Sequence, residues 1–92
     1  MNYEKKSSEQ TTGYGKVSTS QEIGRLITRK RKEIGLKQEI AAGLSGVGTK
    51  FLSQMENGKE TAELGKVLQV LNRMGLELYI FPRSANPLKV DK

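Results

Sequence analysis

The sequence predicts a mainly α domain of four to five short helices, followed by a single C-terminal β-strand. Apolar residues recur at helical spacing between residues 20 and 75. Glycines and one Asn-Gly pair interrupt this pattern where turns are expected. A strict alternation of side chains then follows and stops at Pro82. The 92 residues have room for one small domain.

The first two helices are marked by caps and by apolar spacing. The first is expected to begin at Ser20, a good N-cap, and to end at Gly35 in a left-handed C-cap. Its apolar face comprises Ile23, Leu26, Ile27 and Ile34. The second helix is expected to begin near Lys37 and to continue through residues 38–44.

The third helix is predicted from Thr49 to about Glu56. Before it, Gly46 fits a tight turn and Gly48 fits a cap, and after it Asn57-Gly58 predicts a further turn. Its inward-facing residues are expected to be Phe51, Leu52 and Met55.

The fourth helix is expected to be capped by Thr61 and closed by Gly75. Its apolar residues, at helical spacing, are Leu64, Val67, Leu68 and Leu71.

The segment after Gly75 has the alternation of a strand. The alternating residues are Leu76, Leu78 and Ile80 on one face, and Glu77, Tyr79 and Phe81 on the other. A lone strand leaves its backbone donors and acceptors unpaired, so we expect residues 76–82 to pair with a second copy across a two-fold axis. The expected dimerisation residues are Leu76, Leu78, Tyr79, Ile80 and Phe81. The alternative is an irregular apolar segment packed on the helices.

The two ends of the chain are lean in apolar residues. In residues 1–19, Val17 is the only aliphatic residue beyond Met1, so this segment cannot offset the entropy of ordering and is expected to be a disordered arm. Residues 83–92 are expected to form a flexible tail. This division leaves residues 20–75 as the folded domain.

The amino-acid composition excludes several kinds of site and of catalysis. The chain has no Cys and no His, which excludes disulfides, the common zinc sites and catalysis by Cys or His side chains. We therefore expect no enzymatic activity and no cofactor. A chain this short usually needs a stabiliser, and oligomerisation is the one that remains.

The charge balance is basic, with 16 Lys and Arg against 10 Asp and Glu. Residues 20–59 alone carry eight against four, so most of the excess lies on the folded segment. This favours a polyanionic partner such as nucleic acid over a surface that is merely basic. With no apolar run of about 18 residues and no signal peptide, we expect a cytoplasmic protein that does not bind membranes.

Two short helices joined by a Gly-containing turn suggest a helix-turn-helix. The stretches GLKQE (35–39), GVG (46–48) and FLSQMENGK (51–59) resemble the Cro/repressor-type helix-turn-helix family, often called Xre. The resemblance covers about residues 20–75. It implies a lambda-repressor-like DNA-binding domain of four to five helices.

A finer resemblance is to the HipB-type branch of that family. The segments that carry it are residues 46–48, 50–53, 56–59, 61–62 and 64–71. Members of that branch are antitoxins of HipA-type kinase toxins, repress their own operons as dimers, and carry a strand after the last helix. The sequence departs from the family at Ala41 and Ser45, where larger aliphatic residues are common, and at Glu60, where proline is frequent.

A helix-turn-helix lays its second helix in the major groove, with the early residues toward the bases. The expected base-reading residues are Thr49, Lys50, Ser53 and Gln54. Lys50 can donate to guanine, Gln54 can pair with adenine in a bidentate manner, and the Thr49 methyl can contact thymine. The alternative is a helix face that is simply solvated.

Phosphate contacts are expected beside this helix. Gln38 begins the second helix, where free N–H groups favour an anion, and Lys37 precedes it. The resemblance places Asn57 and Lys59 in a loop that commonly clamps the DNA backbone. It also implies an ion pair between Arg31 and Glu56, whereas the rest of the basic run at 29–32 is expected to be a solvated helix face.

These observations lead to a function. The leading hypothesis is a dimeric repressor of a bacterial operon that is also the antitoxin of a HipA-like kinase and associates with the nucleoid. Its operator is expected to be double-stranded and pseudo-palindromic, with half-sites ~34 Å apart. The first alternative is a stand-alone phage- or plasmid-type repressor without a toxin. The second is a protein-interaction module that has lost DNA binding.

Overall fold

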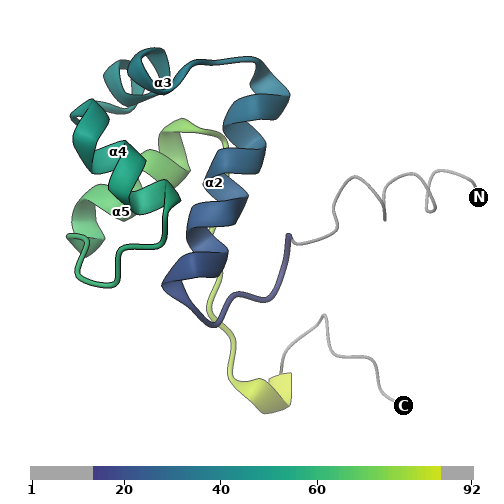
Figure 1. Cartoon of the computed structure of the whole chain (residues 1–92). Helices are drawn as coiled ribbons and strands as arrows, with labels where there is room; N and C mark the ends of the chain where they lie inside the picture. The colour runs from purple at the N-terminus through teal and green to yellow at the C-terminus, as the bar shows by residue number, and fades with distance from the viewer. Residues whose placement is uncertain (1–13, 86–92) are drawn as a thin grey trace, which may run out of the picture.

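The computed structural model describes residues 14–85, and within them four α-helices follow one another (Figure 1). They are α2 (Ser20–Ile34), α3 (Gln38–Ser45), α4 (Thr49–Glu56) and α5 (Leu64–Arg73), and a short 3-10 turn, η1 (Arg83–Ala85), comes last. The predicted helical architecture is confirmed. No helix in this part of the chain is long and apolar enough to cross a membrane. Most of the predicted N-terminal arm and flexible tail lies outside the described residues.

The predicted N-cap of helix α2 is wrong by one residue, since Ser20 is the first helical residue and not the cap. Its N-cap is Thr19, whose hydroxyl accepts from the backbone N–H of Glu22 at 3.1 Å, while the Glu22 carboxylate accepts from the N–H of Thr19 at 3.1 Å. This reciprocal capping box needs an acidic or amide side chain three residues after the cap. Ser20 lacks one at that distance, and its hydroxyl donates instead to the carbonyl of Gly58 at 3.0 Å.

The turns on either side of α3 follow the sequence pattern. Gly35 ends α2 at φ 85° and Gly46 ends α3 at φ 74°, both in the left-handed region that glycine enters without steric cost. Gly48 is the N-cap of α4. Helices α3 and α4, joined by this short turn, therefore have the arrangement of a helix-turn-helix.

The predicted start of the last helix is wrong by two residues. Its N-cap is Glu63 rather than Thr61, and α5 begins at Leu64. Between them, Ala62 packs against the core and its N–H donates to the carbonyl of Lys59 at 3.4 Å. Because the chain must turn here to bring Ala62 inward, the helical geometry starts only after that turn.

Helix α4 packs against α2 and α3, and α3 packs against α5. The buried core comprises Ile27, Ala41, Ala42, Leu52, Met55, Val67, Val70, Leu71 and Met74. Helix α2 crosses α4 closely at Gly24, where an added Cβ would lie 2.5 Å from the carbonyl oxygens of Met55 and Glu56. Glycine is needed at this crossing because any side chain would collide with backbone atoms.

Ser45 is fully buried at the end of α3, and its hydroxyl has no hydrogen-bond partner among the described residues. Its carbonyl accepts from the Gln69 side chain at 2.7 Å, and the Leu44 carbonyl accepts from Arg73 at 3.1 Å. Side chains of α5 therefore supply hydrogen-bond donors for the last carbonyl groups of α3. Small residues fit at Ala41 and Ser45 because α5 packs closely against α3.

After α5 the chain runs in extended form, and residues 76–82 form no strand within the described single chain. Leu76 packs against the core and its N–H donates to the carbonyl of Leu71 at 2.8 Å. Beyond it, Leu78, Tyr79, Ile80 and Phe81 are all exposed. Residues 14–85 contain no β-strand or β-bridge, so the predicted strand remains a prediction about a second copy.

Candidate nucleic-acid interface

The outward face of α4 carries the four residues predicted to meet bases. Thr49 and Lys50 are exposed and Ser53 and Gln54 are half-buried. The opposite face is anchored in the core, since Leu52 is 0% and Met55 is 3% exposed. Helix α4 is therefore held by its apolar side and presents its polar side outward.

The two residues predicted to clamp the backbone after α4 lie directly against this polar face. The Lys59 ammonium donates to the Gln54 side-chain oxygen at 3.2 Å, and the Asn57 amide donates to the Ser53 carbonyl at 3.0 Å. The Gln54 oxygen has a second lone pair, so it can still accept a hydrogen bond from a base. Both Asn57 and Lys59 are exposed at the end of α4.

Arg31 of α2 and Glu56 of α4 form a two-point ion pair. The Arg31 Nε lies 2.7 Å from Glu56 Oε2 and its Nη2 lies 3.0 Å from Oε1. A third guanidinium hydrogen bond, at 2.8 Å, reaches the Leu36 carbonyl. The side chains are 12% and 5% exposed, so this bidentate pair is largely shielded from water.

Gln38, the first residue of α3, joins the same network because its amide donates to Glu56 Oε1 at 2.9 Å. One carboxylate therefore ties α2, α3 and α4 together. Burial raises the pKa of Glu56, but the hydrogen bonds from Arg31 and Gln38 and the charge of Arg31 outweigh it, so the net pKa lies below its usual value. The hydrogen bond from Glu56 raises the pKa of Arg31.

This network changes the role expected of Gln38. Its amide uses one N–H group for Glu56 and keeps a second one, so an anion at the start of α3 could meet this N–H as well as the backbone N–H groups of the first turn. Lys37, the N-cap residue, is exposed and makes no side-chain cap hydrogen bond. Lys37 is therefore placed to add a positive charge at the positive end of the helix dipole.

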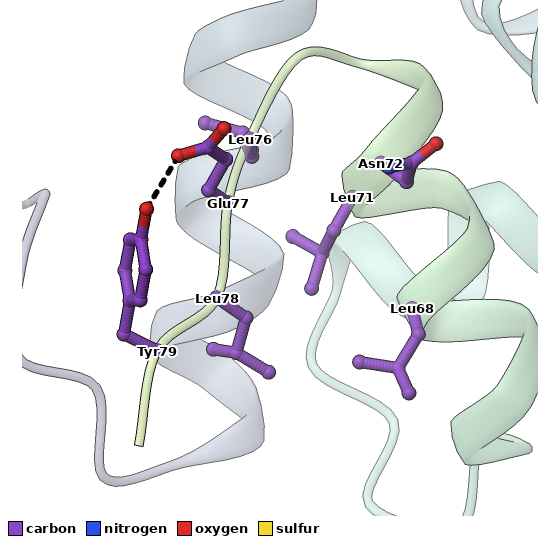
Figure 2. A pocket seen from close by; sticks show the side chains of 7 residues that line it. All are labelled: Leu68, Leu71, Asn72, Leu76, Glu77, Leu78 and Tyr79. Atoms are coloured by element: carbon purple, nitrogen blue, oxygen red, sulfur yellow. Dashed lines mark hydrogen bonds between the residues drawn. The ribbon is translucent and has the colours of Figure 1, made fainter. Parts of the chain in front are cut away.

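Three of the predicted dimerisation residues, Leu76, Leu78 and Tyr79, line a groove of about 360 Å³ between α5 and the segment after it. In Figure 2 the side chains of Leu68, Leu71 and Leu78 point toward one another across this groove. The Tyr79 hydroxyl donates to Glu77 at 2.8 Å, and the Tyr79 ring stacks on Phe81 with centroids 6.0 Å apart. In Figure 2 the Tyr79 ring lies on the side of the extended segment away from these leucines, so the segment exposes apolar side chains on both of its sides.

Two features were not found by sequence reasoning. Gly24 lies in an otherwise helical pattern, and nothing near it in the sequence signals that α4 approaches there. The second is the hydrogen bond between Gln38 and Glu56, which joins two residues 18 positions apart in the chain.

Within the described residues no group of three or more acidic side chains is arranged to hold a metal ion.

The chain has relatives among known proteins, although no family model matches it. It is 45% identical over 65 residues to the uncharacterised HTH-type transcriptional regulator y4mF of Sinorhizobium fredii, covering 71% of this chain and 86% of the relative. Regulators of this kind are not enzymes.

Solved structures share the fold. The HipA–HipB–O2–O3 complex and the HipB–O4 20mer complex each match with a TM-score of 0.69 at 17% identity, covering 76% of this chain and 99% of the matched chain. One conclusion follows from the helix-turn-helix of α3 and α4, from the α2–α4 ion pair and from the similarity to the y4mF regulator. The chain belongs to the Xre/Cro-type HTH transcriptional regulators and has a HipB-like fold.

Proposed function

We propose that the protein is a sequence-specific DNA-binding repressor that binds a pseudo-palindromic operator as a homodimer and represses its own operon. The observation that carries this proposal is the polar face of α4, held outward by a buried apolar face and by the Arg31–Glu56–Gln38 network. Thr49, Lys50, Ser53 and Gln54 read bases, while Lys37, the first turn of α3, Asn57 and Lys59 hold phosphates.

Roles in this interface differ by chemistry. Lys50 donates to guanine, and Gln54 pairs with adenine through its amide, each good bidentate pair contributing about 1–3 kcal/mol of discrimination. Contacts from Asn57 and Lys59 set the register of the protein on the duplex without reading its sequence. Arg31 and Glu56 act by positioning, because their side chains are directed at each other.

The double variant Lys50→Ala/Gln54→Ala tests direct readout. Both side chains project from the polar face of α4, so folding is unaffected and affinity for the operator falls at least tenfold, since two base contacts are lost. A gel-shift titration against duplex DNA selected from a random pool with the wild-type protein measures this. Lys30→Ala, on the side of α2 near Gly75, is the charge-matched control. Unchanged operator affinity in the double variant would reject base reading and favour a protein-interaction module.

We further propose that the protein is a cytoplasmic, nucleoid-associated antitoxin that binds a HipA-like kinase. The HipB-like fold supports this, since one matched structure is a complex that includes HipA. A kinase gene beside this one, and capture of its product by the tagged protein from native cells, are the expected results. Operator binding with neither of them would favour the stand-alone repressor.

A further inference from the structure

A second groove, with a volume of about 700 Å³, lies between α2 and the segment that leads into it. Three of its basic side chains, Arg25, Arg29 and Lys32, come from α2, and a fourth, Lys16, comes from the preceding segment. Asn57 also lines the groove. The groove thus includes a residue already proposed to hold a phosphate, together with side chains of α2 and of the segment that leads into it (Figure 1).

Local contacts hold the leading segment in place. The guanidinium of Arg29 stacks over the Tyr14 ring at 4.6 Å from its centroid, and the Tyr14 hydroxyl donates to Glu33 at 3.2 Å. Nearer to α2, the N–H of Ser18 donates to the Glu22 carboxylate at 2.6 Å. Lys16 therefore lies in a stretch that is pinned to α2 at both ends, which gives the groove a second wall.

The charge of the groove is positive. Two carboxylates line it, and both are already hydrogen-bonded: Glu22 accepts from the backbone of the capping box, and Glu56 accepts from Arg31. Arg25 and Lys32 are exposed and form no ion pair or hydrogen bond of their own within the described residues. Hydrogen bonds from the Ser18 and Thr19 backbone lower the pKa of Glu22, and the charges of Arg25 and Lys16 lower it further, so part of these two charges is balanced by that carboxylate. Arg29 is paired with Glu33 at 3.1 Å, and so contributes less net charge.

We propose that this groove binds phosphate groups of the DNA backbone, as a continuation of the contacts at Asn57 and Lys59. This inference rests on the proposed function. Guanidinium and ammonium groups are the side chains that recognise phosphate, and such contacts add affinity without sequence preference. The basic run at 29–32 then extends the phosphate clamp through Lys32, rather than serving only as a solvated face. Continuity with Asn57 favours DNA over an acidic protein as the occupant.

The double variant Arg25→Ala/Lys32→Ala tests the proposal in the full-length protein. Each lost phosphate contact lowers the slope of log affinity against log salt by about 1, so we expect a slope smaller by about 2 and binding about tenfold weaker. The loss is uniform across operator and random duplexes of the same length. In a phosphate-ethylation interference assay on the selected duplex, the double variant is expected to lose interference only at the phosphates that the groove contacts, which lie nearest Asn57.

Lys30→Ala/Arg83→Ala is the matched control, because it removes one Lys and one Arg that do not line the groove. Circular dichroism melting verifies that both double variants fold. If the groove variant keeps the wild-type salt slope and ethylation pattern while Lys50→Ala/Gln54→Ala loses operator binding, the groove proposal is overturned and the proposed function stands. If the wild type itself selects no DNA, both are overturned.

Discussion

Glu56 shows how one side chain organises the candidate interface. Its two oxygens accept from Arg31 and Gln38, which belong to the two helices that flank α4. A carboxylate buried in this way is stable only because a cation and further hydrogen bonds compensate for its lost hydration. The orientation of the polar face of α4 therefore depends on a residue that need not touch DNA.

Glu56→Gln is expected to lower the free energy of unfolding by about 3 kcal/mol at pH 7, because it leaves the Arg31 guanidinium shielded from water without a counter-charge. Urea denaturation measures this. Glu33→Gln is the control, since its pair with Arg29 is half-exposed and contributes no more than about 1 kcal/mol. Equal losses in the two variants would contradict the assigned role of Glu56.

The same pair predicts a pH dependence. The pKa of Glu56 is lower in the folded protein than its ordinary value of 4.5, so its ionised form stabilises the fold. That contribution is fully present above the ordinary value and is lost as the pH falls through the lower folded pKa. The stability gap between wild type and Glu56→Gln is therefore expected to shrink as the pH falls below about 4.5 in acid denaturation series. A gap that is constant down to pH 2 would argue against the pair.

At the scale of elements, the approach of α2 to α4 sets the geometry of the helix-turn-helix. Gly24 allows the two backbones to meet, and Thr28, one turn later, directs its hydroxyl back to the Gly24 carbonyl at 2.9 Å. The Arg31–Glu56 pair joins the same two helices about two turns further along α2. The packing of α2 on α4 is thus fixed at Gly24 by the close approach of the two backbones, and two turns later by the ion pair of Arg31 with Glu56.

Gly24→Ala is expected to destabilise the protein by about 2 kcal/mol, because its Cβ forces α2 and α4 apart. Gly43→Ala is the matched control, since it is also a helical glycine but its Cβ meets nothing within 4 Å. There the better helix propensity of alanine predicts a gain of about 0.5–1 kcal/mol. Chemical denaturation of both variants decides the matter, and a stabilised Gly24→Ala would show that the helices do not cross as described.

At the scale of the whole molecule, the segment after α5 leaves several apolar side chains uncovered. Ile80 is 89% exposed, and Leu78 and Tyr79 of the same segment line the groove with Leu68. Exposed apolar patches of this kind mark interaction sites. A second copy that pairs along residues 76–82 would cover them and join two recognition helices, as a pseudo-palindromic operator requires.

Removing this surface is expected to abolish the dimer. Truncation after Leu76, which keeps the core contact of that residue, and Ile80→Lys in the full chain both place water or charge where the second copy is proposed to lie. Each is expected to sediment as a monomer at concentrations where the wild type is a dimer. Dimers in both variants would refute pairing through this segment.

The sequence by itself determined the helices, because periodicity, glycine turns and caps act over a few residues. Two helix starts were misplaced for different reasons. Thr19 caps α2 because Glu22, three residues later, completes a capping box, a local signal that the sequence already carries. Helix α5 starts late because Ala62 packs against the core. The residues proposed to read bases were predicted from the spacing of the motif on α4, and the structure places them on the outward face of that helix; their contact with DNA stays a prediction.

Only the tertiary structure decided what depends on residues far apart in the chain. It brought Gln38 to Glu56, required glycine at position 24, and aligned Lys16 with Lys32 around a basic groove. Short-range preferences cannot specify such contacts, since they arise when whole helices pack and the distance between two side chains is set by the core beneath them.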